Sequence, residues 1–265
     1  EEMFGIDLVI PDIAYLKERR SSVRAFVITH AHEDHVGGLP YILPEFPGVP
    51  VYASTLARGL LGNKIKEHKL RDNPLLPLDP GDEAPIGPFR VIPFRIGHSI
   101  PDAMVLAIRT DAGVVLHTGD FKMDQLPLDG RITDLNSFAR LGDEGVDLIM
   151  VDSTNAEVPG FVASESDIVP VLDAVFLRAE GRIIVASFAS HVHRIQQIID
   201  MAVLHGRKVA FVGRSMVRNM GIARDLGYLR IPGGVLVASD ELAGLPDDEA
   251  VLICTGSQGE PMAVL

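Results

Sequence analysis

The stretch THAHEDHVGG, residues 29–38, guides the interpretation of the whole sequence, because it places three histidines and two acids within six residues. The apolar segment VRAFVIT, residues 23–29, predicts a buried β-strand that ends where the histidines begin. In a loop that leaves a strand, side chains can converge on one point instead of alternating between two faces. Imidazole and carboxylate groups at this density are typical of a site for zinc or a similar divalent ion, and they disfavour a simple polar surface turn. The candidate ligands are His30, His32, Asp34 and His35.

Two later positions extend this set of ligands. His98, in FRIGHSIPD, and Asp120, in VLHTGDFK, each follow an apolar strand, so we expect both at the same sheet edge as the histidine cluster. Together the candidates number six, which is too many for one tetrahedral ion. Two ions require a carboxylate that binds both, and Asp120 is the candidate for this bridging position.

Composition limits the class of protein. The chain has 265 residues, of which 47% are hydrophobic, enough for one large domain or two moderate ones. Its single cysteine, Cys254, excludes a disulfide framework and predicts a cytoplasmic protein. No apolar run has the length of a membrane span, so we expect no membrane partner. The net charge of −12 argues against general nucleic-acid avidity but is compatible with a local basic groove.

The order of apolar segments predicts an α/β fold in two parts. Before residue 159, short apolar segments separated by Gly, Pro and Asp are typical of sheet strands, and those from 75 to 118 are expected to be consecutive. From residue 166 onward, helix and strand patterns alternate, which predicts a parallel sheet wrapped by helices. The expected strands are 23–29, 49–53, 75–78, 89–96, 103–110, 113–120, 146–154, 181–188, 207–213 and 250–257. The expected helices are 35–46, 54–70, 166–179, 190–206 and 215–227.

Several motifs carry a resemblance to a known family. HAHEDH followed by single His and Asp motifs resembles the metallo-β-lactamase superfamily of two-zinc hydrolases. Further motifs along the whole chain resemble, more narrowly, the ribonuclease J family of the β-CASP nuclease group. These motifs are EEMFGIDLVIPD, FRIGHSIPDA, HTGDFKMD, VDSTNAEVPG, HRIQQ, GRSM and CTGSQGEPM.

The resemblance implies the fold in more detail. It implies a metallo-β-lactamase αββα fold into which a β-CASP domain is inserted, with a mostly parallel sheet flanked by helices. Residues 1–158 are then expected to form the N-terminal portion of the first domain, and residues 159–265 an incomplete β-CASP domain. Two further histidine motifs of the group have no counterpart before Leu265, so we expect both domains to be incomplete in this sequence.

The resemblance also implies the chemistry. It implies hydrolysis of RNA phosphodiester bonds, as a 5′–3′ exonuclease and endonuclease in RNA maturation and decay, with a water activated between two metal ions. The expected cofactor is a pair of Zn²⁺ ions, with Mn²⁺ or Mg²⁺ as alternatives in activity. The expected substrate is single-stranded, 5′-monophosphorylated RNA, and the expected full-length assembly is a homodimer or homotetramer. The implied ligands are His30, His32 and His98 for one ion and Asp34 and His35 for the other, with Asp120 between them.

Asp152, in MVDST, matches an acidic motif of the β-CASP group. The resemblance implies that its carboxylate accepts the ring N–H of a ligand histidine, which would fix the tautomer of that ligand. Without the resemblance, an Asp at a strand end is more often a turn-capping residue. Asp34, Asp120 and Asp152 are therefore the expected catalytic acids.

Two junctions between strand and helix are candidates for holding RNA. Free backbone N–H groups at a helix N-terminus attract phosphate, and ASFASHVHR and VGRSM each place a serine at such a junction. The alternative is that serine only caps the helix and the arginine is a surface residue. The related family usually has Asn where His191 stands, and TGSQGEP, residues 255–261, forms a third junction. The candidates are Ala189, Ser190, His191, Arg214 and Ser215.

Three other functions remain open at this stage. A small-molecule hydrolase such as a lactonase or thioesterase is disfavoured, because an inserted α/β unit is superfluous for a small substrate. A DNA nuclease is a nearer alternative, since no residue visibly recognises a 2′-hydroxyl. A metal-free RNA-binding relative or scaffold is disfavoured, because all six candidate ligands are present.

Overall fold

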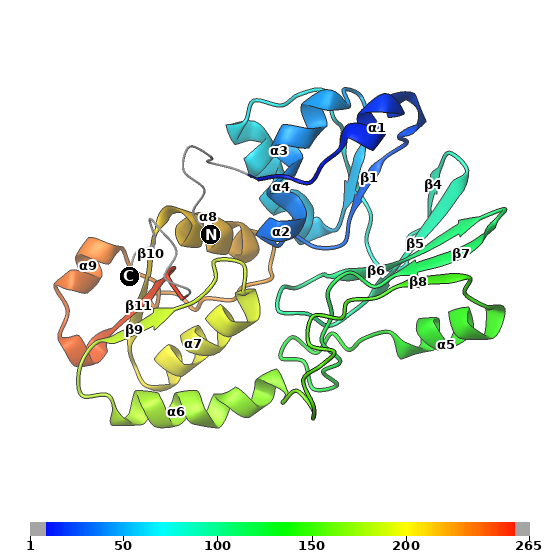
Figure 1. Cartoon of the computed structure of the whole chain (residues 1–265). Coiled ribbons are helices and arrows are strands. Elements are labelled where there is room, and N and C mark those ends of the chain that lie inside the picture. The colour runs from blue at the N-terminus through cyan, green and yellow to red at the C-terminus, as the bar shows by residue number, and fades with distance from the viewer. Residues whose placement is uncertain (1–8, 258–265) are drawn as a thin grey trace.

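The computed structural model describes residues 9–257, which form three sheets and their flanking helices (Figure 1). The first sheet has the order β1-β2-β3, and all its strands are parallel. Its strands are β1 (Phe26–Ile28), β2 (Val51–Ala53) and β3 (Leu75–Pro77). Its helices are α1 (Ala14–Glu18), α2 (Glu33–Val36), α3 (Leu39–Ile42) and α4 (Thr55–Glu67). Short 3-10 turns at Arg20–Ser22 and Leu43–Glu45 complete this layer.

The second sheet has the order β4-β5-β6-β7-β8 and is antiparallel except for the parallel pair β7 and β8. Its strands are β4 (Ala84–Ile86), β5 (Phe89–Arg95), β6 (Met104–Thr110), β7 (Gly113–His117) and β8 (Leu148–Met150). One helix, α5 (Leu135–Glu144), follows β7 in the chain, and the carboxylate of Asp134 caps its N-terminus. This helix was not expected from the sequence.

Alternating side chains of β6 join the layers of this part of the chain. Met104 and Leu106 pack toward the first sheet, together with Val27 and Tyr52 from that sheet. Val105 belongs instead to the cluster that contains Leu141 of α5. Because strand residues alternate between two faces, one strand contributes to both apolar layers. The result is the expected αββα arrangement, with helices outside two packed sheets.

The third sheet is fully parallel and has the order β10-β11-β9. Its strands are β9 (Ile183–Ala186), β10 (Lys208–Val212) and β11 (Ala250–Cys254). Its helices are α6 (Val169–Arg178), α7 (Val192–Leu204), α8 (Arg214–Asp225) and α9 (Ser239–Ala243), with 3-10 turns at Glu165–Ile168 and Asp247–Glu249. The alternation of strand and helix predicted from residue 166 onward is confirmed, and the mixed α/β fold class with it.

The largest apolar cluster joins the first and third sheets. It contains Leu56 and Leu61 of α4 as well as Met216 and Met220 of α8, all fully buried. The two helices approach closely at Gly59, where a Cβ would lie 2.8 Å from Cδ1 of Leu226. Because this core crosses residue 158, the early and later parts of the chain pack as neighbours, and the expected boundary at residues 158 and 159 stays a prediction.

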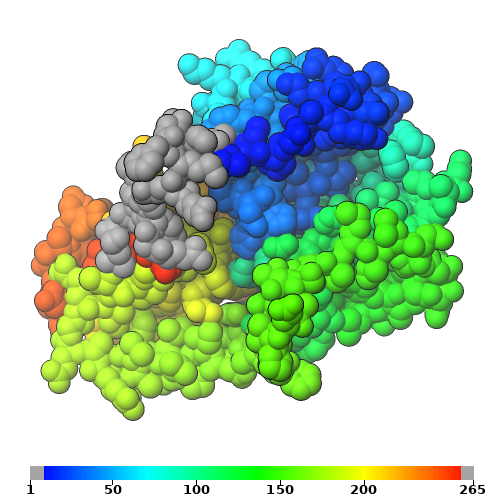
Figure 2. Space-filling model, in the orientation of Figure 1, coloured from blue at the N-terminus to red at the C-terminus, as the bar shows by residue number. Residues whose placement is uncertain are grey.

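The space-filling view shows the same arrangement from outside (Figure 2). The yellow-green surface of α6 lies along the lower edge and meets the green surface of the preceding segment near the middle of the view.

Within residues 9–257, no helix combines the length and apolar character needed to cross a lipid bilayer.

One expectation about the strands was wrong. Residues 75–78 were expected to begin a series of consecutive sheet strands, but β3 pairs with β2 in the first sheet. The consecutive series begins instead with β4, which the sequence did not predict. The chain therefore changes sheets between β3 and β4.

Candidate metal centre

The six candidate ligands lie in loops that leave three different strands or in the helix that follows one of them. His30 and His32 lie in the loop after β1, while Asp34 and His35 belong to the first turn of α2. His98 follows β5, and Asp120 follows β7. These segments come from both sheets of the early part of the chain.

Two features bring the loops after β1 and β7 together. The backbone N–H of Met104, at the start of β6, donates to the carbonyl of Thr29 at 3.0 Å, which joins the two sheets next to the histidines. Gly119 then passes close to this point with φ +59°, and a Cβ there would lie 3.0 Å from Cβ of Thr29 and 3.1 Å from the carbonyl of Met104. Only glycine combines this backbone conformation with so close an approach. The next residue is Asp120.

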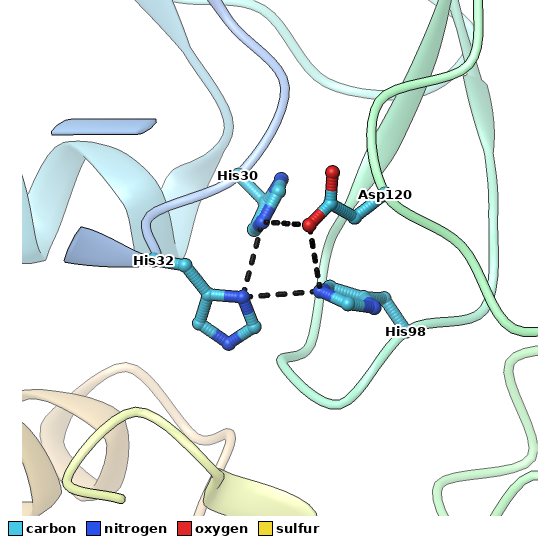
Figure 3. A group of neighbouring side chains, drawn as sticks. All are labelled: His30, His32, His98 and Asp120. Atoms are coloured by element: carbon cyan, nitrogen blue, oxygen red, sulfur yellow. Dashed lines mark hydrogen bonds and ion pairs between the residues drawn. The ribbon is translucent and has the colours of Figure 1, made fainter. Parts of the chain in front are cut away.

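The first group of ligand atoms consists of three ring nitrogens and one carboxylate oxygen (Figure 3). Nδ1 of His32 lies 3.1 Å from Nε2 of His30 and 3.0 Å from Nε2 of His98. Oδ2 of Asp120 lies 3.9 Å from Nε2 of His30 and 3.9 Å from Nε2 of His98. The four atoms face one another across a small central space, as Figure 3 shows.

These separations fit a tetrahedral divalent ion. Metal–ligand bonds of about 2.0–2.2 Å place tetrahedral ligand atoms roughly 3.3–3.6 Å apart. The observed separations of 3.0, 3.1, 3.9 and 3.9 Å lie on both sides of that range. Small side-chain movements therefore suffice to reach ideal coordination, and the donor types are those that zinc and similar ions prefer.

A second group of ligand atoms comes from Asp34, His35 and Asp120. Nε2 of His35 lies 3.4 Å from Oδ2 of Asp34 and 3.3 Å from Oδ2 of Asp120. The same oxygen of Asp120 therefore takes part in both groups. The two groups share a carboxylate, as the sequence predicted for a bridging position.

Burial disfavours the charged form of the three histidines in the first group. Burial, followed by the positive charge of neighbouring histidines, lowers the pKa of His30 to about 2. Burial likewise lowers the pKa of His32 to about 4, and it lowers the pKa of His98. Neutral imidazole keeps one nitrogen lone pair free, which is the form that binds a metal.

Hydroxyl groups of neighbouring residues contact the outer ring nitrogens of two of these histidines. Oγ1 of Thr29 lies 3.1 Å from Nδ1 of His30, and Oγ of Ser99 lies 3.3 Å from Nε2 of His32. If each of these ring nitrogens carries the proton and donates to the hydroxyl, the other ring nitrogen presents its lone pair to the cluster. Sequence reasoning missed both hydroxyl residues, although each is adjacent in the chain to a candidate ligand.

Comparisons with known proteins agree with this geometry. A family model described as the metallo-beta-lactamase superfamily matches residues 4–151. The chain belongs to the metallo-β-lactamase superfamily. A second family model, described as the beta-CASP domain of ribonuclease J, matches residues 180–265. The resemblance to ribonuclease J that the motifs predicted is confirmed.

Relatives within this superfamily are similar over nearly the whole chain. A Ribonuclease J from Mycolicibacterium smegmatis is 50% identical over 98% of this chain and 47% of its own length. A Ribonuclease J from Thermus thermophilus is 46% identical over 100% of this chain and 47% of its own length. The chain thus spans about half the length of these relatives.

A solved structure supports the fold alone. A protein of unknown function from Enterococcus faecalis aligns with a TM-score of 0.62 at 17% identity, covering 86% of this chain and 58% of that one. At this level of identity the similarity concerns the backbone and not the chemistry.

Asp152 matches the acidic β-CASP motif and lies near His98, but its carboxylate forms hydrogen bonds with residues other than the candidate ligands. Its carboxylate accepts the N–H and hydroxyl of Thr154 at 3.0 and 2.7 Å and the N–H of Phe121 at 3.4 Å. Burial acts to raise the pKa of Asp152, but these hydrogen bonds and the nearby charge of His98 lower it overall. In residues 9–257 its carboxylate forms no hydrogen bond with a ligand histidine, so the expected tautomer-fixing role stays a prediction.

The junctions expected to hold RNA lie at one edge of the third sheet. Because β9, β10 and β11 are parallel, the turns after all three open at the same edge. Arg214 and Ser215 are the first two residues of α8, and Ala189 and Ser190 form the turn before α7. The third junction lies partly outside the described residues, since the description ends at Ser257.

His191 caps α7. Its Nδ1 accepts the backbone N–H of Arg194 at 3.3 Å, so the alternative reading of a serine cap is wrong at this helix. Burial, followed by the charge of Arg194, lowers the pKa of His191 to about 4, and the charge of His32 contributes to the shift. His193, in the first turn of α7, lines a pocket together with His98 and Lys122, so the first junction lies near the metal-bearing loops.

Proposed function

We propose that the chain carries the catalytic metal centre of a ribonuclease that hydrolyses RNA phosphodiester bonds. The observation that carries this proposal is the shared oxygen, since Oδ2 of Asp120 lies 3.3 Å from His35 of one group and 3.9 Å from His30 and His98 of the other. Two adjacent metal positions are suited to phosphoryl transfer, where attacking and leaving oxygens both need charge stabilisation. The names of the relatives support RNA as the substrate.

We further propose that the cofactor is a pair of divalent ions, Zn²⁺ first, with Mn²⁺ or Mg²⁺ as alternatives in activity. His30, His32 and His98 would hold one ion, Asp34 and His35 the other, and Asp120 both. The ions would supply Lewis acidity, which polarises a phosphate and acidifies water so that it attacks near neutral pH.

The residues of the chain prepare this site in three ways. The low pKa values of His30 and His32 keep their imidazoles neutral, so no proton has to leave before a metal binds. The hydroxyl of Ser99 orients the ring of His32. The side chain of Asp34 is 73% exposed, so the second group faces solvent and is open to a phosphodiester.

The strand-end junctions would hold the RNA. At α8, Gly213 supplies no side-chain cap, so among residues 9–257 no capping side chain competes with phosphate for the first N–H groups of the helix, from Arg214 and Ser215. At α7, the turn Ala189–His191 precedes His193, which lines a pocket together with His98. We propose single-stranded, 5′-monophosphorylated RNA as the substrate, exonucleolytic and endonucleolytic cleavage, and a role in RNA maturation and decay. Cytoplasmic location and a homodimeric or homotetrameric assembly also remain predictions.

The test is a cleavage assay with the full-length protein and Zn²⁺ or Mn²⁺. The substrates are a 3′-labelled, 5′-monophosphorylated single-stranded RNA and the DNA of the same sequence. We expect progressive loss of RNA from the 5′ end and far slower loss of DNA. Asp34→Ala should abolish the reaction, whereas Asp111→Ala, at an exposed carboxylate in the turn after β6, should leave it unchanged.

Other results would redirect the assignment. Equal cleavage of DNA and RNA would favour a nuclease without sugar specificity. Failure to cleave either polymer while two metal ions are bound would overturn the ribonuclease proposal and favour a small-molecule hydrolase of the same superfamily.

A further inference from the structure

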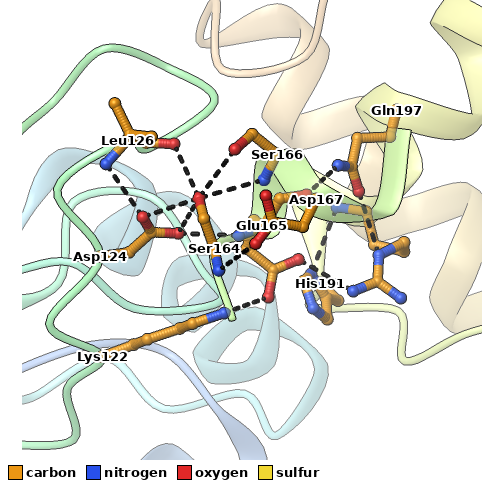
Figure 4. A network of polar contacts seen from close by, with 10 residues as sticks. Lys122, Asp124, Leu126, Ser164, Glu165, Ser166, Asp167, His191 and Gln197 are labelled. Atoms are coloured by element: carbon orange, nitrogen blue, oxygen red, sulfur yellow. Dashed lines mark hydrogen bonds and ion pairs between the residues drawn. The ribbon is translucent and has the colours of Figure 1, made fainter. Parts of the chain in front are cut away.

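One carboxylate joins the metal-bearing part of the chain to the third sheet. Glu165 accepts a hydrogen bond from Nζ of Lys122 at 2.9 Å on Oε1 and from a guanidinium nitrogen of Arg194 at 2.8 Å on Oε2 (Figure 4). The two cations approach from opposite sides, one from the loop after β7 and the other from the first turn of α7. Each oxygen of the carboxylate thus serves a different part of the molecule.

Lys122 lies in the middle of the metal-bearing loops. It follows Asp120 by two residues, and its backbone N–H donates to the carbonyl of Gly97 at 2.7 Å, next to His98. The backbone of Lys122 is thus anchored to the loops that carry Asp120 and His98, while its side chain extends toward Glu165.

Arg194 lies at the junction before α7, which is one of the candidates for holding RNA. Its backbone N–H donates to Nδ1 of His191, and its side-chain Nε donates to Oε1 of Gln197 at 3.1 Å. The guanidinium that Glu165 binds thus belongs to Arg194, whose backbone N–H is held by the cap of α7, His191. Glu165 lies between this cap and the loop of Asp120.

The backbone of Glu165 is held on both sides. Its N–H donates to Oδ2 of Asp124 at 2.8 Å, and its carbonyl accepts from Nε2 of Gln197 at 2.7 Å. The hydroxyl of Ser164 also donates to the carboxylate of Asp124, at 2.9 Å. These bonds fix the backbone of Glu165, and the bonds to Lys122 and Arg194 hold its carboxylate.

The charge of Glu165 balances the two cations. Burial acts to raise its pKa, but the hydrogen bonds from Arg194 and Lys122 outweigh it and lower the pKa to about 2. The side chains of Glu165, Lys122 and Arg194 are only 18%, 23% and 28% exposed, so loss of the acid would leave two partly buried positive charges facing each other. Such charges repel and separate the elements that carry them.

We propose that Glu165 is a positioning residue that couples the metal centre to the junction at His191, so that an RNA strand held at the junction meets the metal centre in register. This inference rests on the proposed ribonuclease function. It separates two requirements of the reaction: a small phosphodiester needs only the metal centre, whereas RNA needs the metal centre and the junction in a defined relative position.

The test compares two substrates in the full-length metal-loaded protein. Glu165→Gln keeps the shape of the side chain but removes its charge. We expect kcat/KM for a single-stranded RNA to fall roughly 10- to 100-fold, because misplacement of a substrate by about 1 Å has effects of this size. Hydrolysis of bis(p-nitrophenyl) phosphate by the same variant should stay within about 3-fold of wild type, since this substrate does not extend to the junction.

Asp173→Asn is the matched control. The carboxylate of Asp173 lies 2.7 Å from Nε2 of His205 within the later part of the chain, so the variant also replaces a hydrogen-bonded carboxylate by an amide but should leave both activities unchanged. Glu165→Asp retains the charge and is the second variant, to be used if Glu165→Gln does not fold. The shorter side chain cannot reach both cations, so it too should lose activity on RNA selectively.

Three outcomes would overturn the proposal. Equal losses on the two substrates would place the effect of Glu165 in the metal centre alone. Unchanged activity on both substrates would show that the contacts of Glu165 with Lys122 and Arg194 have no role in the reaction. Wild-type protein that hydrolyses the small diester but not RNA would contradict the proposed function itself, and the coupling with it.

Discussion

Nε2 of His98 lies 3.0 Å from Nδ1 of His32, although the two histidines are 66 residues apart in the sequence. They come from the ends of β5 and β1, which belong to different sheets. Two uncharged ring nitrogens at this distance can share a hydrogen only if one of them carries it, and both can instead present lone pairs to a common ion. The packing of the two sheets therefore creates the metal centre.

Substitution of Asp120 should remove metal from both positions. Its Oδ2 takes part in both ligand groups, so Asp120→Ala should reduce the metal content of the full-length protein from about two ions per chain to below about one. Metal content after dialysis is measured by mass spectrometry of the ions. Asp111→Ala, at the exposed turn after β6, should retain both ions. Full metal content in Asp120→Ala would exclude a bridging role.

Removal of the hydroxyl of Ser99 should weaken metal binding without removing a ligand. In Ser99→Ala the ring of His32 loses the hydroxyl that lies 3.3 Å from its Nε2, so this contact no longer holds the orientation of the ring. We expect metal affinity to fall about 10- to 100-fold, measured by competition with a chelating dye. Ser239→Ala is a control, because Ser239 forms no side-chain hydrogen bond within residues 9–257. An unchanged affinity in Ser99→Ala would mean that the hydroxyl does not orient the ligand.

A methyl group at Gly119 should damage stability and metal binding together. At φ +59° a side chain is strained, and its Cβ would lie 3.0 Å from Thr29 and 3.1 Å from the carbonyl of Met104. Gly119→Ala should therefore lower the free energy of unfolding by about 1–3 kcal/mol and reduce metal content. Gly142→Ala, in α5 with open space around it, should raise the same free energy by up to about 1 kcal/mol. Both are measured by urea unfolding, and equal effects of the two substitutions would contradict the close approach at Gly119.

Histidine at position 191 should make stability depend on pH. Its pKa is about 4 in the folded protein against 6.5 as the ordinary value, so between these values the unfolded chain binds a proton that the folded chain does not. By linkage, the free energy of unfolding falls as the pH drops from 6.5 toward 4, and by pH 5.5 the loss from this group is about 1 kcal/mol. His191→Asn can cap α7 without titrating, so it should reduce this loss.

The pH prediction is measured by urea unfolding of metal-free wild type and His191→Asn at pH 7.5 and 5.5. The difference between the two pH values should be smaller in the variant. The same difference in both proteins would show that His191 is accessible to protons in the folded state.

The later part of the fold could be predicted from local patterns, but its strand order could not. Strand and helix periods alternate clearly from residue 166, and each predicted element there is present. The central position of β11, the last strand within residues 9–257, depends on pairing with β9 and β10. Likewise β3 has the same apolar pattern whichever sheet it joins. The helix α5 was missed, although Asp134, which accepts the N–H of Ser137 at 3.1 Å, was a usable capping signal.

The candidate ligands could be predicted because the chemistry of the site concentrates them in the sequence. Four lie within six residues, and the other two follow apolar strands. Their partners could not be predicted in the same way. Ser99 is adjacent to His98 in the chain but contacts His32, and Glu165 meets Lys122 and Arg194 only after three segments pack together. Contacts of this kind depend on tertiary packing, which leaves no local pattern.

The most direct test of the central claim is anomalous X-ray diffraction at the zinc edge from crystals of the full-length protein grown with Zn²⁺. We predict two peaks about 3.5–4 Å apart, both in contact with Asp120. One should also contact His30, His32 and His98, and the other Asp34 and His35. The absence of any peak among these side chains at saturating Zn²⁺, or a single ion that does not touch Asp120, would contradict the account.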